Sequence, residues 1–321
     1  MAENTVKKIA TRESYGNSLK ELAEEFPNLV VLDADLAAAT KTGIFRKAYP
    51  DRHIDCGIAE ENMMGVAAGL SLVGKIPFVS SFAMFAAGRA FEQVRNSIGY
   101  PHLNVKIGAT HAGITVGEDG ATHQCNEDIA LMRTIPGMVV MCPSDDVEAR
   151  AAVRAALEYE GPVYIRFGRA AVPVINDHPG YHFEIGKGTV VREGKDVTIV
   201  ATGICVDSAL GAAKMLEEEG ISAEVVNICT IKPLDEEIIL NSAKKTGKVV
   251  TVEEHSVIGG LGSAVCDCLC AHYPVPVKKV GMQDVFGESG SAAALVEKYG
   301  LDAKGAYKSA QALPQGIHDI K

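Results

Sequence analysis

Short apolar runs alternate with helical patterns through both halves of the chain, and this alternation limits the possible folds more than any other feature. Expected strands cover residues 28–35, 76–80, 105–109, 138–141, 163–167, 197–201, 223–227, 248–253 and 277–280. Helical patterns cover residues 12–26, 60–72, 86–98, 145–158, 206–219, 235–246, 261–272 and 292–299. Strands joined by helices in this way form right-handed βαβ units around mostly parallel sheets. The sequence therefore predicts an α/β protein.

The chain is long enough for two such domains, since 321 residues exceed the usual size of one. Midway along the chain the alternation stops, and Pro173 and the polar run Asn176–Gly180 are typical of a linker. We expect two doubly wound domains, residues 1–172 and the smaller 189–321, joined by a linker at 173–188.

Composition argues against several classes of partner. A formal net charge of -10 argues against a nucleic-acid partner, because phosphate backbones are bound by basic surfaces. A hydrophobic content of 47% with 22% charged residues is typical of soluble globular proteins, and no apolar run could span a membrane. Met1–Lys20 lacks the apolar core of a signal peptide, so we expect a cytoplasmic location. The eight cysteines are then expected to be reduced thiols, most of them buried.

Glu60 and Glu61 stand at the start of a helical pattern rich in small residues, in the stretch I-D-C-G-I-A-E-E-N-M-M. Acidic side chains are favoured at a helix N-terminus, so an ordinary acidic helix start is one interpretation. A carboxyl group turned into a dry pocket would instead be suited to share a proton with a ring nitrogen of a ligand. These two residues are therefore candidates for acid–base chemistry.

Two phenylalanines, Phe82 and Phe85, stand just after an expected strand in S-S-F-A-M-F-A-A-G. Such a pair usually belongs to the core, but it also suits the apolar wall on which a planar heterocycle stacks. Arg12 and Arg169 are cations that could make bidentate hydrogen bonds to a substrate phosphate, or they could be ordinary surface residues.

The stretch A-T-H-A-G-I-T-V-G-E-D-G-A-T-H-Q, residues 109–124, is the most specific candidate for a ligand-binding loop. Its glycines allow sharp turns and a close approach of the backbone to a ligand. His111 and His123 can donate to phosphate or hydroxyl oxygens, and Asp119 can accept from a hydroxyl. A metal site is the rival interpretation, but the short paired spacing of zinc ligands is missing, so we assign no metal ligands.

Together these motifs resemble one enzyme family. G-I-A-E-E-N-M, S-S-F-A-M-F and G-E-D-G-A-T-H-Q occur in the order and spacing of the pyrimidine-binding and C-terminal domains of transketolase, a thiamine-diphosphate enzyme. The resemblance covers essentially the whole chain and implies a pyrimidine-binding-type domain followed by a smaller C-terminal-type α/β domain. A full-length transketolase also has an N-terminal domain with a G-D-G…N motif for magnesium and the diphosphate, and no G-D-G occurs here. The chain is therefore similar to the C-terminal subunit of a split transketolase.

The resemblance implies roles around the cofactor. Glu60 corresponds to the family's glutamate, which bonds a pyrimidine nitrogen of thiamine diphosphate and so promotes loss of the thiazolium C2 proton. Phe82 and Phe85 correspond to the aromatic wall around the pyrimidine ring. Asp35 corresponds to an acid near the cofactor and the subunit interface.

The resemblance also implies a sugar site. Asp119 and His123 correspond to groups that bind sugar hydroxyls beside the reacting carbonyl, which makes His123 a catalytic candidate. Arg12, His111 and Arg169 correspond to the pocket for the terminal phosphate of the sugar.

Two positions depart from the family pattern. Residues 37–39 are alanines where the family often has a phosphate-binding serine, and Thr40 is the nearest substitute. This departure weakens the expectation of a phosphorylated substrate. Gly88 stands where a tyrosine commonly completes the aromatic wall, so the pyrimidine pocket is expected to be looser.

The function implied is transfer of a two-carbon ketol unit from a ketose phosphate to an aldose phosphate. An N-terminal transketolase subunit would supply the magnesium and diphosphate ligands in an α2β2 assembly. The alternatives are the β subunit of a 2-oxoacid dehydrogenase and a non-catalytic regulatory subunit that kept the fold; deoxyxylulose phosphate synthase normally keeps all its domains on one chain. The C-terminal domain is assigned no chemistry, because Gly259–Gly262 is better explained as a packing turn before a helix.

Overall fold

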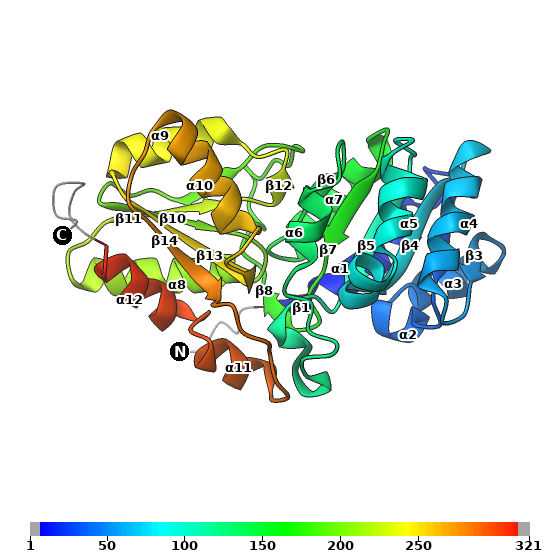
Figure 1. The fold of residues 1–321 in the computed structure, drawn as a ribbon, viewed down its shortest axis with the longest axis horizontal. Helices are drawn as coiled ribbons and strands as arrows, with labels where there is room; N and C mark the ends of the chain where they lie inside the picture. Colours follow the sequence, from blue (N-terminus) through cyan, green and yellow to red (C-terminus); the bar gives the residue numbers. More distant parts are fainter. Residues whose placement is uncertain (1–6, 314–321) are drawn as a thin grey trace. The chain divides into compact units, whose positions relative to one another are not determined.

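The computed structural model describes residues 7–313, which divide into two compact units (Figure 1). The first unit holds residues 7–112 and 131–185, and the second holds residues 113–130 together with those from 186 onward. Each unit is wound around its own sheet of mostly parallel strands. The predicted fold class, two α/β domains, is therefore confirmed.

The predicted domain ranges, 1–172 and 189–321, stay a prediction. They include residues 1–6 and 314–321, which lie outside the described part of the chain. Between these ends, residues 113–130 belong to the second compact unit although they precede the predicted linker.

The sheet of the first unit is parallel, with its strands in the order β6-β7-β5-β4-β2-β3. Its strands are β2 (Leu29–Asp33), β3 (His53–Asp55), β4 (Ile76–Phe82), β5 (Lys106–Thr110), β6 (Val139–Met141) and β7 (Val163–Arg166). All residues of these strands except those of the edge strand β3 are buried. Burial on both faces explains why the strands appear in the sequence as almost continuous apolar runs.

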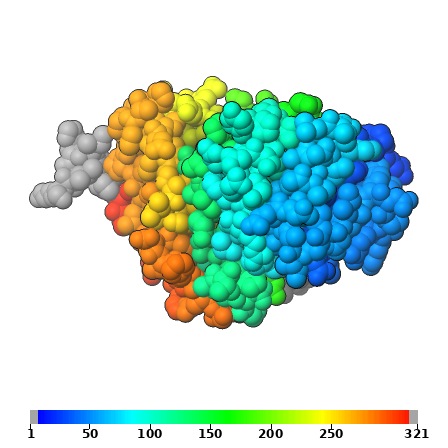
Figure 2. Space-filling model, turned by 45° about the vertical axis from the view of Figure 1, so that its right-hand side comes forward, coloured from blue at the N-terminus to red at the C-terminus, as the bar shows by residue number. Residues whose placement is uncertain are grey.

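Helices cover both faces of this sheet. They are α1 (Thr11–Leu22), α2 (Ala37–Thr40), α3 (Gly43–Ala48), α4 (Glu60–Leu72), α5 (Phe91–Gln93) and α7 (Asp146–Glu158), with the 3₁₀ turn η1 (Pro50–Arg52). Helix α1 packs against α3 and α7, whereas α4 packs against η2 (Met84–Arg89) and η3 (Val94–Gly99), beside which it lies in Figure 2. Right-handed crossovers put these two groups on opposite faces.

The helix expected at residues 86–98 differs in detail from the structure. Residues 84–89 and 94–99 are π-helical, and only the short α5 between them is α-helical. A π-helical turn contains one residue more than an α-helical turn, so it shifts the side chains that follow it around the helix axis.

Tyr15 fixes α1 to the sheet. Its ring stacks on Phe167 at 4.6 Å between centroids and lies 5.9 Å from Phe78, and its hydroxyl is 2.5 Å from the Ser80 hydroxyl. A side chain at Gly108 would collide with the Tyr15 ring, so the strand needs glycine there. This packing holds the beginning of α1 at the carboxyl ends of the strands.

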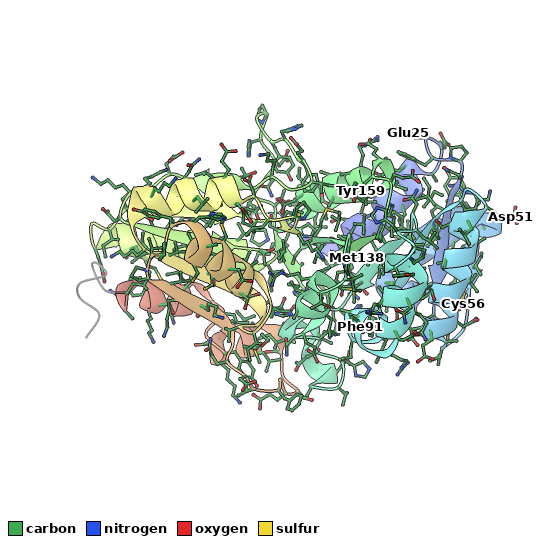
Figure 3. The ribbon with its side chains drawn as sticks, turned by 45° about the horizontal axis from the view of Figure 1, so that its top comes forward. Glu25, Asp51, Cys56, Phe91, Met138 and Tyr159 are labelled. Carbon is green, nitrogen blue, oxygen red and sulfur yellow. The ribbon has the colours of Figure 1, made fainter. Side chains whose placement is uncertain are left out.

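A fully buried lysine closes the opposite end of the first sheet. Lys106 begins β5, and its Nζ donates to the carbonyls of Gly161 and of Tyr159, which is labelled in Figure 3, at 2.7 Å each. The two carbonyls supply the hydrogen bonds that a buried ammonium group requires.

The segment predicted to be the linker is held at its beginning. β1 (Lys8–Ala10) pairs antiparallel with β8 (Ala171–Pro173). The amides of Ile175 and Asn176 then both donate to Oδ2 of Asp145 at 2.7 Å. The first residues after β8 therefore belong to the packed structure of the first unit.

The second unit has a five-stranded sheet in the order β14-β13-β10-β11-β9, with only β9 antiparallel. Its strands are β9 (Thr189–Arg192), β10 (Val197–Ala201), β11 (Ala223–Asn227), β13 (Val249–Ser256) and β14 (Val277–Met282), and β12 (Thr230–Lys232) is a further short strand. Its helices are α8 (Cys205–Glu218), α9 (Glu236–Thr246), α10 (Leu261–His272), α11 (Ala292–Lys298) and α12 (Ala303–Gln311). Helix α8 packs against α12, and α9 packs against α10 on the other side of the sheet (Figure 1).

The inserted segment 113–130 adds a little helical structure to this unit. It contains the 3₁₀ turn η4 (Ile114–Asp119) and the first residues of the short helix α6 (Asp128–Arg133). The turn η4 packs against α11.

Two expectations from composition, on membrane-spanning segments and on the burial of cysteines, can be checked in the structure of residues 7–313. None of the helices in this range is long and apolar enough to cross a membrane. Cysteines 125, 142, 205, 229 and 268 are buried, as expected of small apolar side chains.

Candidate functional site

Glu60 begins α4 and turns its carboxyl group into the protein. The residue is only 1% exposed, whereas the neighbouring Glu61 lies on the surface. Ser81, on β4, donates to Oε1 of Glu60 at 3.3 Å, and Arg89 donates to Oε2 at 2.9 Å. A buried carboxylate needs such partners because its desolvation is costly. The two glutamates therefore differ sharply in environment.

The two candidate phenylalanines stack on each other beside this carboxyl group. Phe82 ends β4 and Phe85 lies in η2, with ring centroids 6.0 Å apart and an interplanar angle of 17°. The guanidinium carbon of Arg89 lies 4.6 Å from the Phe85 centroid while its Nη1 bonds Glu60. Arg89 thus links the buried acid to the aromatic pair.

His111 extends this cluster toward the beginning of α1. Its ring stacks on Phe82 at 3.9 Å between centroids, and its Nε2 lies 2.9 Å from Nη1 of Arg12. A guanidinium group can only donate, so Nε2 accepts, and the neutral ring carries its proton on Nδ1, 2.9 Å from the Thr110 hydroxyl. This assignment leaves the ring neutral and the positive charge on Arg12.

Arg12 and Arg169 form a region of positive charge in the first unit. Burial, together with the charge of Arg169, lowers the pKa of Arg12. Nη1 of Arg12 also donates to the carbonyl of Ala39 at 3.0 Å. Two neighbouring cations repel each other, so an anion bound between them would be favoured.

Thr40, the nearest hydroxyl to the three alanines, is bonded within the first unit. Its hydroxyl is buried and lies 2.9 Å from Oδ2 of Asp33 and 3.1 Å from the carbonyl of Leu36. These contacts occupy the hydroxyl within the first unit. That Thr40 is the nearest substitute for the family's serine stays a prediction.

Asp35 lies apart from the cluster of Glu60, Phe82 and His111. Its side chain is exposed, its φ of 58° is in the left-handed region, and its amide donates to Oδ1 of Asp55 at 3.1 Å. No contact among the described residues joins it to that cluster, so its role near the cofactor stays a prediction.

Sequence reasoning missed two charged residues, Asp33 and Arg89. Asp33 is fully buried and accepts from the Leu36 amide and the Thr42 hydroxyl, yet burial raises its pKa to about 6. It belongs to the same D-A-D stretch as Asp35, at the carboxyl end of a buried strand, which was the available signal. Arg89 directly follows Gly88 and had no comparable signal.

Asp119 and His123 belong to the second unit. Asp119 is exposed at the end of η4, and His123 is half-buried with Nδ1 2.9 Å from the Thr122 hydroxyl. The segment around them turns at Gly113, Gly117 and Gly120, whose φ angles of 76°, 84° and 74° are strained for other residues. The glycines of the G-E-D-G motif are therefore required by the backbone itself.

Comparison with known families decides what kind of protein carries these residues. Residues 7–174 match the transketolase pyrimidine-binding domain, and residues 186–305 match the transketolase C-terminal domain. The chain belongs to the transketolase family. The resemblance drawn from the sequence motifs is thereby confirmed.

Relatives of similar length carry the same two domains. A putative transketolase C-terminal section of Methanocaldococcus jannaschii is 52% identical, over 91% of this chain and 92% of the relative. A 6-deoxy-6-sulfo-D-fructose transketolase subunit of a Clostridium species is 50% identical, over 91% of each chain. A solved structure described as a split gene transketolase, inactive beta4 tetramer, is 58% identical, with a TM-score of 0.88 over 96% of this chain and 98% of that one.

Proposed function

We propose that this chain is one subunit of a split transketolase that moves a two-carbon ketol unit from a ketose phosphate to an aldose phosphate. The observation that carries the proposal is the buried carboxyl group of Glu60 beside the stacked rings of Phe82 and Phe85. A buried acid next to apolar, flat surfaces is what a planar nitrogen heterocycle requires of a protein.

Thiamine diphosphate fits this set of residues. Glu60 and Phe85 share contact with the half-exposed Arg89, so the acid and an aromatic face lie beside the same movable side chain. Glu60 would hold the proton of a pyrimidine nitrogen, Phe82 and Phe85 would pack on the ring, and Asp35 is retained as a cofactor neighbour. When bound, the cofactor supplies the carbanion chemistry, and the protein supplies position and electrostatics.

The sugar is proposed to bind through its charge and its hydroxyls. Arg12 and Arg169, with His111 fixed between Arg12 and Phe82, would hold a terminal anion. Asp119 and His123 would accept from and donate to sugar hydroxyls, with His123 close to the reacting carbonyl. The Clostridium relative is named for a sulfonated sugar, and a sulfonate, like a phosphate, is an anion that arginines bind.

A partner subunit is part of the proposal. The sequence has no G-D-G motif for magnesium and the diphosphate, so an N-terminal transketolase subunit would bring both. The names of the relatives, a C-terminal section and a subunit, support a divided enzyme. We propose a cytoplasmic α2β2 assembly and expect this chain alone to associate with itself without activity. The related beta4 tetramer, which is described as inactive, supports this expectation.

The relatives do not favour the β subunit of a 2-oxoacid dehydrogenase.

The other alternative, a non-catalytic subunit that kept the fold, can be tested by substituting Glu60. In the complex with its partner, Glu60→Gln should lower ketol transfer by at least about 100-fold, because proton transfer contributes that much in many enzymes. Glu61→Gln is the matched control at the exposed neighbour and should keep nearly full activity. Normal turnover of the Glu60→Gln complex would refute the catalytic proposal.

A further inference from the structure

Three consecutive ionisable residues near the end of strand β13, in the second unit, are all buried. Glu253 and His255 are 0% exposed and Glu254 is 3% exposed. Burying such groups is costly unless each is hydrogen-bonded, so their partners indicate what they do.

Glu253 has a structural explanation. Its two carboxylate oxygens accept from the amides of Leu261 and Gly262, at 2.7 and 2.8 Å, in the first turn of α10. A carboxylate at a helix N-terminus satisfies unpaired amides and interacts favourably with the helix dipole. Glu253 therefore fixes α10 to the sheet.

Glu254 holds a different part of the chain. Its Oε1 accepts from the backbone amide of Thr115 at 2.6 Å, a short bond of the charge-assisted kind. A side chain at Gly113 would collide with the Glu254 carboxyl group, so the glycine also permits this close approach. The contact lies at the beginning of the segment 113–130.

The next two residues of β13 hold the end of the same segment. Nε2 of His255 accepts from the amide of Ala130 at 3.3 Å, while its Nδ1 lies 2.7 Å from the carbonyl of Ser256. The amide of Ser256 donates to the carbonyl of Asn126 at 2.7 Å. The end of β13 thus bonds both ends of the segment that carries Asp119.

The middle of the segment is also tied to the second unit. The side-chain amide of Gln124 donates to the carbonyl of Glu288 at 2.9 Å and to the carbonyl of Gly117 at 3.3 Å. Gln124 directly follows His123. These contacts leave Asp119 and His123 on a backbone that is fixed at its beginning, middle and end.

We propose that Glu254 is a positioning residue for sugar binding, holding segment 113–130 so that Asp119 and His123 are presented in one arrangement. The inference rests on the proposed function for the role of those two residues. It gives the C-terminal part of the chain, to which the sequence assigned no chemistry, a share in substrate recognition. A segment pinned by a buried carboxylate loses little further conformational entropy when the sugar binds.

The positioning contact can be measured in this chain without cofactor or partner. Glu254→Asp shortens the side chain by one methylene and should lose the bond to the Thr115 amide while leaving the sheet intact. Amide hydrogen exchange at residues 113–119 should then be about tenfold faster or more. Glu254→Gln keeps an acceptor oxygen at the same reach and should restore most of the protection. Unchanged exchange in the Glu254→Asp chain would overturn the proposal.

The consequence for the sugar is measured in the complex with the partner subunit. Glu254→Asp should raise KM for the sugar substrates about tenfold, with Glu254→Gln closer to wild type, and leave the Kd of thiamine diphosphate unchanged. Glu224→Gln is the matched control, because it alters another buried carboxylate of the second unit, which pairs with Lys245 and not with segment 113–130, and it should leave KM near the wild-type value. An equal rise in KM in the Glu254→Asp complex and in the control complex would overturn the sugar-binding role. So would an unchanged KM in the Glu254→Asp complex. If the wild-type complex transfers no ketol unit, the proposed function fails, and hydrogen exchange still decides the contact.

Discussion

Arg89 donates to Oε2 of Glu60 at 2.9 Å, and its guanidinium group covers the ring of Phe85. The two charges differ in environment, since the side chain of Glu60 is 2% exposed and that of Arg89 is 46% exposed. A half-exposed arginine is well suited to this position, because it offsets a buried negative charge and can still move into water.

The first prediction concerns this ion pair. Arg89→Met should lower the free energy of unfolding of the chain by about 1 kcal/mol, because it removes a partner of a buried carboxylate at a partly solvent-screened site. In a Glu60→Gln background the same substitution should cost much less, since no charge remains to be offset. Urea unfolding of the four proteins gives the coupling energy directly. A coupling energy near zero would mean that Arg89 does not stabilise Glu60.

The second prediction concerns the anion of the sugar. Arg12→Met and Arg169→Met should each raise KM for a phosphorylated aldose by about 10- to 100-fold, because charge-assisted bonds of this kind contribute roughly 1.5–3 kcal/mol. KM for the unphosphorylated aldose and the Kd of thiamine diphosphate should change little. Steady-state kinetics of the complex provide the measurement, with the exposed Arg95→Met as control. Equal losses with both sugars would place the arginines outside a phosphate pocket.

The third prediction concerns the dependence of stability on pH. Burial raises the pKa of Asp33 to about 6 from an ordinary 3.8, so the folded chain binds a proton there more tightly than the unfolded chain. The stabilisation from this proton is complete below pH 3.8 and is lost as the pH rises through 6. Relative to Asp33→Asn, the wild-type chain should therefore gain about 2 kcal/mol in unfolding free energy as the pH falls from 7 to 4.

Urea unfolding of both chains between pH 4 and pH 7 tests this expectation. Asp51→Asn is the control, since Asp51 is exposed and should leave the pH dependence of the wild type unchanged. A constant difference between wild type and Asp33→Asn across this range would show that Asp33 titrates alike in the folded and unfolded chains.

Local sequence patterns predicted the elements of the site better than its contacts. The sequence predicted both the helix that begins at Glu60 and the strand that leads to Phe82. Apolar periodicity and the residues that interrupt helices and strands are local signals, so they can be recognised in a single sequence. The expected helix at residues 86–98 was wrong in detail. Two π-helical segments keep enough of the apolar face that periodicity alone could not distinguish them from an α-helix.

The contacts that sequence reasoning missed join residues far apart in the chain. Arg89 is 29 residues from Glu60, and Glu254 is 139 residues from Thr115. Both carboxylates are buried, and their partners are selected by tertiary packing, for which a single sequence carries no local signal. The part that Glu254 and His255 play in holding residues 113–130 could be inferred only from the structure.

The central claim is that this chain supplies half of a divided active site. The most direct test is calorimetric titration of thiamine diphosphate and magnesium into the purified chain, first alone and then with a partner that carries the G-D-G…N domain. The same mixtures are assayed for ketol transfer. We expect neither cofactor binding nor ketol transfer with the chain alone, and both with the partner present. Tight magnesium-dependent binding by this chain alone, or cofactor binding in the complex without ketol transfer, would contradict the central claim.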